Sequence, residues 1–309
     1  APLSEAFGQW RNARWVLIAL LGAVAGQAVV WYTGQFYALF YLERILKVDG
    51  ATANILIAVA LAIGTPAFLL FGWLSDKIGR KPIILAGCAL AAVLYFPLFS
   101  ALTQAANPAL SDAQARAPVT VYADPGTCSV QFDPIGRTTF DKSGCDVAKS
   151  TLAKAGIPYS SESYGNGSIT IGERTVEAGE LATYGQRITA AVTQAGYPAQ
   201  ADPAALNTPL VIAILTVLVL LVTMVYGPIA ALLVELFPAR IRYSAMSLPY
   251  HIGNGWFGGF LPTIAFAMVA ATGNIYAGLW YPVGVAVLTV VVGLLFLPET
   301  FRRRIDQAQ

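Results

Sequence analysis

The chain has 309 residues, of which 56% are hydrophobic and 12% are charged, and its formal net charge is +2. A soluble domain carries roughly twice that charged fraction, so the composition excludes an ordinary soluble protein and indicates a polytopic membrane protein. The net charge is too small to suggest a nucleic-acid partner, and the cations lie at the ends of apolar segments rather than in a patch. We also expect no metal site and no cofactor, because no apolar segment presents paired acids or a cluster of metal ligands.

Six apolar segments are long enough to cross a bilayer as helices, which takes about 20 residues each. Gly64 and Pro66 interrupt the second segment, and Gly227 and Pro228 interrupt the fourth, so both helices should break there. The sequence therefore predicts an all-α polytopic fold with spans near residues 15–41, 52–73, 81–103, 208–237, 244–271 and 276–297.

Residues 104–207, hereafter the insert, separate the third span from the fourth and differ in composition from the rest of the chain. Charged residues, Ser, Thr and Gly return there, and no apolar run is long enough to cross a bilayer. We expect a compact α+β domain, because short alternating segments typical of strands occur together with helical patterns. The predicted strands are 119–122 and 168–171, the predicted helices are 146–155 and 177–195, and the predicted linkers are 106–117 and 197–209.

Lys and Arg residues are distributed unevenly between the two sides that six spans define. Both tails and the loops near 76–82 and 238–242 hold ten of them, whereas the short loops on the other side hold only Arg44 and Lys47. Because short loops rich in Lys and Arg stay inside, we expect both termini in the cytoplasm. The membrane itself is expected to be a bacterial inner membrane. Residues 1–103 and 208–309 would then be the two membrane parts, and the insert would be extracytoplasmic.

Two of the three cysteines, Cys128 and Cys145, lie in the insert, 17 residues apart. Disulfides form in oxidising compartments, so an extracytoplasmic insert favours a bridge between them. Two free thiols are the alternative that the sequence leaves open.

The loop between the second and third spans, residues 72–82, brings three cations and one carboxylate into a few residues. Asp76 can reach Arg80 or a helix N-terminus, so the loop is predicted to act as an electrostatic latch. It resembles, position by position, the cytoplasmic loop motif of the major facilitator superfamily, which recurs after the second and eighth helices of a twelve-helix transporter. The predicted gating residues are Gly72, Asp76, Lys77, Gly79, Arg80 and Lys81 of this loop, together with Arg240 and Arg242 of the loop after the fourth span.

Residues 235–244, with the Gly-rich helix after them, resemble the junction of the tenth and eleventh helices in the metabolite:proton symporter family. Residues 31–37 and 298–300 resemble that family's seventh helix and the end of its twelfth. The resemblance implies that the six spans are helices seven to twelve, that an amino-terminal half of six helices is missing, and that the whole protein symports a small organic acid or zwitterionic osmolyte with protons.

The insert departs from this pattern, because most members of the family join the ninth and tenth helices by a short loop. Four roles for it remain open on the sequence. It could bind substrate, contact another envelope protein or shield the carrier, or it could be an insertion tolerated at a loop tip.

Alternating access would place the substrate near the bilayer midplane, between two six-helix halves. Aromatic and amide side chains can hold a small carboxylate or zwitterion there without burying a fixed charge. The single histidine could bind substrate, carry a proton or make a structural hydrogen bond, and the coupling acid is expected in the missing half because no carboxylate lies deep in a span. The candidate cavity residues are Gln27, Tyr32, Gln35, Tyr37, Tyr226, His251 and Asn254.

Other functions fit these features less well. The alternative of a facilitator or exporter of the same superfamily does not account for the symporter-like junction at 235–244. A membrane-anchored sensor with a ligand-binding insert would have no use for the latch loop or the helix breaks. We do not expect an enzyme, since no nucleophile accompanies the histidine. The expected partners are a small-molecule substrate, protons and the lipid bilayer.

Overall fold

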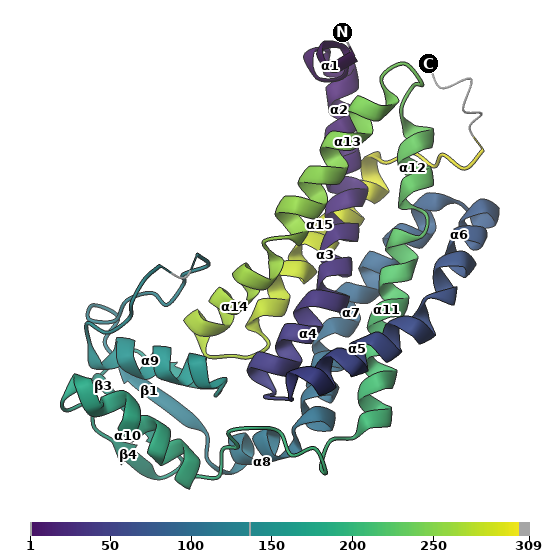
Figure 1. Ribbon diagram of the computed structural model, residues 1–309. Helices are drawn as coiled ribbons and strands as arrows, with labels where there is room; N and C mark the ends of the chain where they lie inside the picture. Colours follow the sequence, from purple (N-terminus) through teal and green to yellow (C-terminus); the bar gives the residue numbers. More distant parts are fainter. Residues whose placement is uncertain (1, 136, 303–309) are drawn as a thin grey trace.

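The computed structural model describes residues 2–135 and 137–302. Within these residues, six helices are long and apolar enough to cross a membrane, and each overlaps one predicted span. They form one bundle, which has the first helix of the chain at one end, the terminal end, and the insert at the other, the insert end (Figure 1). The six spans are Trp10–Ile45, Gly50–Ile78, Arg80–Ala106, Thr208–Leu236, Arg242–Thr272 and Ala277–Phe296.

The first span is a continuous helix of 36 residues, well beyond the about 20 that cross a bilayer. Three π-helical turns interrupt its α-helical pattern, and turns of this kind occur frequently at functional sites. The predicted segment, 15–41, is too short at both ends. Apolar residues mark only the part of the helix inside the bilayer, whereas the helix continues beyond it on both sides. After α1 (Pro2–Gly8), its segments are α2 (Trp10–Ala19), η1 (Leu20–Val24), α3 (Ala25–Tyr32), η2 (Thr33–Tyr37), α4 (Ala38–Phe40) and η3 (Tyr41–Ile45).

The second and fourth spans break where the sequence predicted. α5 (Gly50–Gly64) ends just before α6 (Pro66–Ile78), and α11 (Thr208–Tyr226) is separated from α12 (Ile229–Leu236) by a glycine and a proline. Both predicted breaks are confirmed. The other spans consist of α7 (Arg80–Ala106); α13 (Arg242–Ile252), η4 (Gly253–Gly258) and α14 (Leu261–Thr272); and η5 (Ala277–Leu279) and α15 (Trp280–Phe296).

Close helix contacts hold the first, third and sixth spans together. α7 packs against both α11 and α15, and α3 packs against α15. A Cβ atom on Gly26 of α3 would lie 2.7 Å from Cys88 Sγ on α7 and 2.7 Å from Thr289 Cβ on α15. Because membrane helices associate through van der Waals packing at small residues, this glycine sets how closely the three helices approach.

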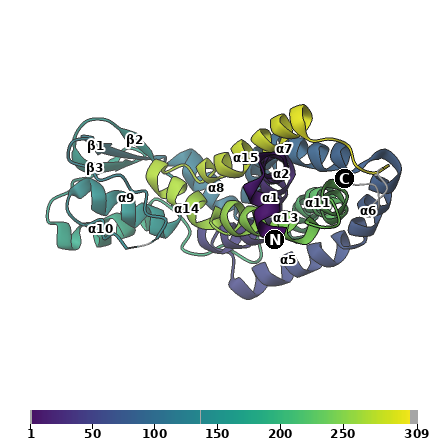
Figure 2. The same cartoon turned by 90° about the horizontal axis from the view of Figure 1, so that it is seen from above.

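The insert is an α+β domain in which two helices cover one face of a four-stranded sheet (Figure 2). The strand order is β2-β1-β3-β4, with β1 parallel to β2 and antiparallel to β3. Alternate residues of β1 and β3 are buried, as the period-two pattern predicted, and α9 packs on both strands. The elements are α8 (Pro108–Arg116), β1 (Val119–Ala123), α9 (Gly144–Ala155), β2 (Ser160–Glu162), β3 (Asn166–Ile171), β4 (Arg174–Val176) and α10 (Leu181–Gln194).

The predicted linker at 106–117 is wrong, because most of it forms α8. The side chain of Asn107 accepts a hydrogen bond from the Leu110 backbone N at 3.0 Å and so caps the helix. Its Nδ2 donates to the Leu46 carbonyl oxygen at 2.9 Å, which ties this cap to the end of the first span. The predicted helix at 177–195 begins only at Leu181, after β4 and a turn at Gly179 with φ +51°.

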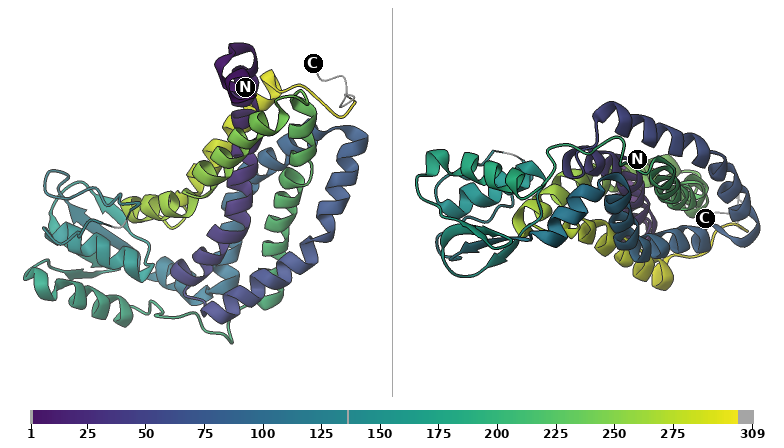
Figure 3. Two further views of the ribbon diagram at one scale, coloured as in Figure 1. Left: turned by 45° about the horizontal axis from the view of Figure 1, so that its top comes forward. Right: turned by 90° about the horizontal axis from the view of Figure 1, so that it is seen from below.

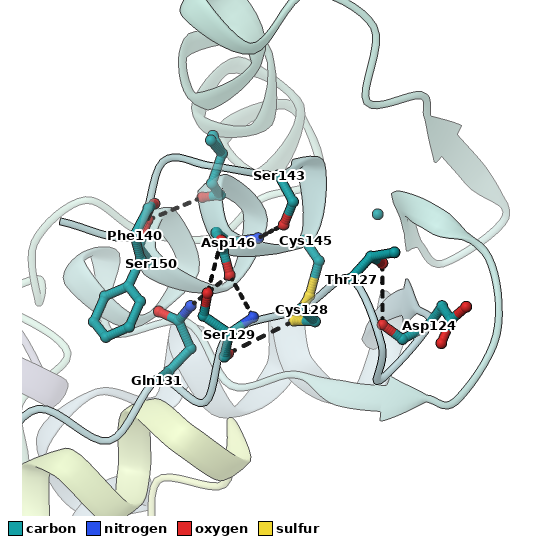
Figure 4. Close-up of a disulfide and its surroundings, with 12 residues drawn as sticks. Asp124, Thr127, Cys128, Ser129, Gln131, Phe140, Ser143, Cys145, Asp146 and Ser150 are labelled. Atoms are coloured by element: carbon teal, nitrogen blue, oxygen red, sulfur yellow. Dashed lines mark hydrogen bonds between the residues drawn. A yellow bond between two sulfur atoms is a disulfide. The ribbon is translucent and has the colours of Figure 1, made fainter. Parts of the chain in front are cut away.

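A disulfide joins Cys128 to Cys145, with the two Cα atoms 5.5 Å apart (Figure 4). Asp146 at the start of α9 organises the segment around it. Its carboxylate accepts hydrogen bonds from the Ser129 backbone N at 2.8 Å and from the Ser129 hydroxyl at 3.1 Å. The bridge and this buried carboxylate together hold the irregular segment before α9 against the helix.

The insert is docked onto the ends of the first and fifth spans, beside α14 (Figure 3). Tyr159, which is buried, donates from its hydroxyl to the Ala270 carbonyl oxygen at 2.6 Å and from its backbone N to the Gly273 carbonyl oxygen at 3.0 Å. On the first span's side, the Ala201 backbone N donates to the Lys47 carbonyl oxygen at 3.0 Å. These bonds bridge two spans through one domain.

Candidate functional site: a charge network and a polar cluster

Arg80, the first residue of α7, lies at the centre of a charge network at the terminal end. Its guanidinium forms ion pairs with Asp76 of α6 and, at 3.1 Å, with Glu235 of α12, and it donates to Ser75 Oγ at 2.6 Å. The side chains of Arg80 and Glu235 are only 10% and 11% exposed, whereas that of Asp76 is 59% exposed. The buried pair therefore carries most of the electrostatic stabilisation, because exposed pairs are screened by water.

Glu299, just after the last span, closes this network from the other side. Its carboxylate accepts hydrogen bonds from the backbone N of Arg80 at 3.0 Å and of Lys81 at 3.1 Å, so it caps the N-terminus of α7. The Lys81 ammonium donates to the Leu297 carbonyl oxygen at 2.7 Å. The Thr300 hydroxyl donates to Glu235 at 2.7 Å. The network thus ties together the second, third, fourth and sixth spans.

The predicted gating residues fall into two groups. Asp76, Gly79, Arg80 and Lys81 belong to the charge network. Outside it, the Lys77 ammonium lies 6.0 Å from the centre of the Trp73 ring, Arg240 pairs with Glu5 at 3.1 Å on the surface, and Arg242 Nε donates to the Phe237 carbonyl oxygen at 3.0 Å. Gly72 faces open space. Four further residues belong to the network although the sequence did not predict them there: Ser75, Glu235, Glu299 and Thr300.

Gly79 has φ +111°, a backbone conformation that side chains with a Cβ rarely adopt, and a Cβ there would overlap the Glu299 carboxylate. We expect Gly79→Ala to lower the free energy of unfolding by about 1–3 kcal/mol, through backbone strain and loss of the helix cap. The measurement is thermal unfolding of the purified protein in detergent. Gly72→Ala is the matched control, since nothing lies near its Cβ position. Equal melting temperatures for the two variants would contradict this account.

A second site, hereafter the polar cluster, lies between the first, fourth and fifth spans. The amides of Gln27 and Asn254 form reciprocal hydrogen bonds at 3.3 and 3.4 Å, and Gln27 is fully buried. Beside them, the hydroxyls of Tyr226 and Tyr250 lie 3.1 Å apart. The cluster offers hydrogen-bond donors and acceptors but no fixed charge.

Aromatic rings extend the polar cluster along the first span. The Trp31 ring lies 5.6 Å from the Tyr226 ring and 5.1 Å from the Tyr32 ring, and Tyr32 lies 5.2 Å from Phe36. Tyr32 and Tyr226 were predicted as cavity residues, whereas Trp31 and Tyr250 were not. The sequence feature that could have identified Tyr250 is its position four residues before Asn254, which puts both residues on the same face of the helix.

The remaining candidates make no hydrogen bond to the polar cluster in the described part of the chain, although the His251 ring lies 5.8 Å from the Tyr250 ring. Tyr37 is buried between Phe99 and Phe266, with ring centres 5.6 and 5.3 Å away, and its hydroxyl has no hydrogen-bond partner in the described part of the chain. His251 is exposed, and its Nδ1 lies 2.8 Å from the Ser247 carbonyl oxygen. Gln35 is half-buried. Residues 2–135 and 137–302 contain no group of three His, Cys, Asp or Glu side chains that could hold a metal ion.

Known proteins resemble both membrane parts of the chain. Residues 1–113 match the sequence model of the Major Facilitator Superfamily, and residues 181–309 match that of the Sugar (and other) transporter family. With six membrane-length helices, these matches define a multi-pass membrane protein of the transporter class rather than an enzyme. The chain belongs to the major facilitator superfamily, and its predicted membership is confirmed.

Three curated relatives illustrate the likeness. The alpha-ketoglutarate permease of Escherichia coli (strain K12) is 35% identical over 101 residues, which are 33% of this chain and 23% of the permease. A putative proline/betaine transporter of Staphylococcus haemolyticus (strain JCSC1435) is 38% identical over 77 residues, 25% of this chain and 16% of the relative. The glycine betaine/proline/ectoine/pipecolic acid transporter OusA of Dickeya dadantii (strain 3937) is 34% identical over 82 residues, 26% and 16% of the two chains.

The chain thus matches less than a quarter of the length of each of these relatives. No solved structure matches it.

Proposed function

We propose that the chain is the carboxyl-terminal six-helix half of a secondary active transporter that symports a small organic acid or zwitterionic osmolyte with protons. The observation that carries this proposal is the buried Arg80–Glu235 pair, in a chain that belongs to the major facilitator superfamily. The pair joins α7 to α12 at the terminal end, where a carrier that alternates between two open states needs a contact that forms in one state and opens in the other.

The polar cluster supports a substrate site near the middle of the bundle. Gln27, Tyr226, Tyr250 and Asn254 come from three different spans and are all uncharged. Amide and hydroxyl groups can bind a carboxylate or a zwitterion by hydrogen bonds, and the nearby rings favour a cationic ammonium. The names of the matched relatives cover substrates of both kinds, an organic acid and zwitterionic osmolytes.

Proton coupling requires a group that titrates within the transport pathway. In the described spans, the acids Glu43, Asp76 and Glu235 lie near span ends, and the last two are engaged by Arg80. His251 is exposed and lies beside a backbone carbonyl, which supports its structural role. We therefore assign the coupling acid to an amino-terminal six-helix half.

The proposed topology puts the terminal end in the cytoplasm of a bacterial cell and the insert outside it. The connection from α6 to α7 and that from α12 to α13 both lie at the terminal end (Figure 1). They carry Lys77, Arg80, Lys81, Arg240 and Arg242, in agreement with the preference of cations for the inner side. Arg303 and Arg304 of the predicted basic tail lie outside the described residues. The disulfide agrees with an oxidising compartment around the insert.

The test is uptake by proteoliposomes that contain the natural polypeptide of which this chain is part. Labelled α-ketoglutarate, proline and glycine betaine are offered with and without a pH gradient, alkaline inside. A symporter accumulates one of them only while the gradient lasts. Uptake that equilibrates without the gradient indicates a facilitator, and no uptake of any of the three with correctly inserted protein contradicts transport of these substrate classes.

Asp76→Asn is expected to lower the initial rate of uptake by about fivefold or more, because the variant keeps the fold but loses the charge that orients Arg80. The measurement is the same uptake assay, normalised to the amount of protein in the membrane. Asp112→Asn, an exposed carboxylate on α8, is the matched control and should transport normally. Normal uptake by Asp76→Asn would remove Asp76 from the gating mechanism.

A further inference from the structure

The carboxyl end of α9 lies directly against the first span, and the contact is close. Gly156, which ends α9, has φ +69°, and a Cβ atom on it would lie 2.9 Å from the Arg44 carbonyl oxygen. The Lys47 ammonium donates to the Lys154 carbonyl oxygen at 3.3 Å. Three cationic residues from two parts of the chain, Arg44, Lys47 and Lys154, therefore meet at the insert end.

An open pocket of about 490 Å³ lies at this junction, hereafter the junction pocket. A neighbouring pocket of about 660 Å³ shares five of its wall residues with it, among them Arg44 and Lys154. Volumes of this order suit small organic molecules. The walls of the junction pocket come from η3 and the residues after it, from α9 and from α14: Glu43, Arg44, Ile45, Lys47, Ala153, Lys154, Phe266, Val269 and Ala270.

The cations of the junction pocket lack anions. The Arg44 guanidinium lies 5.3 Å from the centre of the Phe40 ring and 5.6 Å from that of Phe266, and in the described part of the chain neither Arg44 nor Lys154 forms an ion pair. Partial burial lowers the pKa of the Lys47 ammonium, the direction expected for a cation without an anion beside it. The two rings hold the guanidinium in place while its N–H groups stay available.

The carboxylates on the walls of the two pockets are engaged elsewhere. Glu43 accepts a hydrogen bond from Asn54 Nδ2 at 3.2 Å. Asp133, on the neighbouring pocket, accepts from the backbone N of Ile135 at 3.2 Å and from that of Thr138. The junction pocket itself has three cations and one carboxylate on its walls, so its potential is positive.

We propose that the junction pocket is a binding site for a small organic anion with at least one carboxylate. The guanidinium and ammonium groups would bind the carboxylate oxygens by charge-assisted hydrogen bonds, and Phe266 with the alanines would contact the carbon skeleton. This site is separate from the polar cluster, and the insert contributes Ala153 and Lys154 of α9 to its walls. The insert thus takes part in ligand binding.

Four side chains of the first span lie in sequence between the two sites. Tyr32, Phe36, Phe40 and Arg44 follow one another at a spacing of four residues, with Tyr32 beside Phe36 and Phe40 beside Arg44. As a capture site, the junction pocket would raise the local concentration of the anion at the insert end. This role as a capture site depends on the proposed transport function, whereas binding at the pocket does not.

A cysteine at Ala153, on the pocket wall, gives a readout of occupancy that needs no transport. The thiols already in the described chain do not interfere, because Cys88 is buried and the other two are bridged. In the natural polypeptide in lipid nanodiscs, we expect α-ketoglutarate, citrate or acetate to slow labelling of Ala153→Cys by a charged maleimide. Glycine betaine should not slow it. Ala190→Cys on α10, outside both pockets, is the control and should label at a constant rate.

Charge removal then tests the assignment of the cations. Arg44→Gln and Lys154→Gln should each raise the anion concentration that gives half-maximal protection of the cysteine roughly tenfold. Lys154→Arg, and Lys142→Gln at an exposed position of the insert, should leave that concentration unchanged. No protection by any of the three carboxylates, or equal protection by glycine betaine, overturns the inference. If protection depends on Arg44 but the proteoliposomes show no uptake, the pocket stands and the proposed transport function falls.

Discussion

Replacing Arg80 with alanine is expected to lower the free energy of unfolding by about 3–5 kcal/mol, because it leaves the buried Glu235 carboxylate without its cation. The measurement is chemical or thermal unfolding of the purified protein in a mild detergent. Asp76 contributes little to this loss, since it is 59% exposed and its pair with Arg80 is screened by solvent.

Two further variants separate a buried ion pair from a general loss of packing. Arg240→Ala removes an arginine that is 80% exposed and pairs with Glu5, and it should change the stability by less than about 1 kcal/mol. Arg80→Met combined with Glu235→Leu removes both charges and keeps apolar volume, so it should recover most of the stability. If the Arg80→Ala variant is as stable as the Arg240→Ala variant, the Arg80–Glu235 pair does not hold the terminal end together.

Breaking the disulfide should have the next largest effect, and it should be confined to the insert. Cys128→Ser with Cys145→Ser frees a loop closed across 17 residues, which the chain-entropy model values at about 3 kcal/mol. The insert buries only a small core, so this loss is a large part of what keeps it folded. The measurement is limited proteolysis of membrane-embedded protein, read as the rate of cleavage within residues 104–207.

Cys88→Ala is the control for that experiment, because it removes a buried free thiol of the third span and leaves the insert intact. The six spans should remain inserted in both variants. If the double serine variant is cleaved no faster than Cys88→Ala, the bridge does not stabilise the insert. Asp146, which holds the same segment through Ser129, would then carry the stability of this region.

The membrane helices were readable from the sequence because bilayer length and apolar composition mark them directly. The same composition rule gave the wrong answer for α8, since its alanines and its proline are typical of a linker as well as of a short capped helix. What forms the helix is the Asn107 cap, whose amide is held by the Leu46 carbonyl oxygen 61 residues away. A contact of that separation leaves no local pattern.

Some residues of the candidate sites could likewise be predicted from local patterns, whereas others could not. The Asp76–Arg80 pair follows from a spacing of four residues, and the reading of Gln27 and Asn254 as buried amides follows from polar groups that need partners inside a membrane. By contrast, Tyr37 was selected for its polar hydroxyl, although the structure places it among aromatic rings. Helix rotation decides such cases, and the π-helical turns around Tyr37 change that rotation.

The sequence by itself determined the class of protein, the six spans and the α+β insert, because each depends on composition or on residues close together in the chain. The predicted loop at 72–82 is wrong as a loop, since α6 continues to Ile78 and α7 begins at Arg80, which leaves only Gly79 between the two helices. Only the tertiary structure decided which carboxylates meet Arg80, since Glu235 and Glu299 lie 155 and 219 residues away from it. The same holds for the junction pocket, where α9 brings Lys154 to Arg44. Burial and charge act through space, so partners distant in sequence are chosen by helix packing alone.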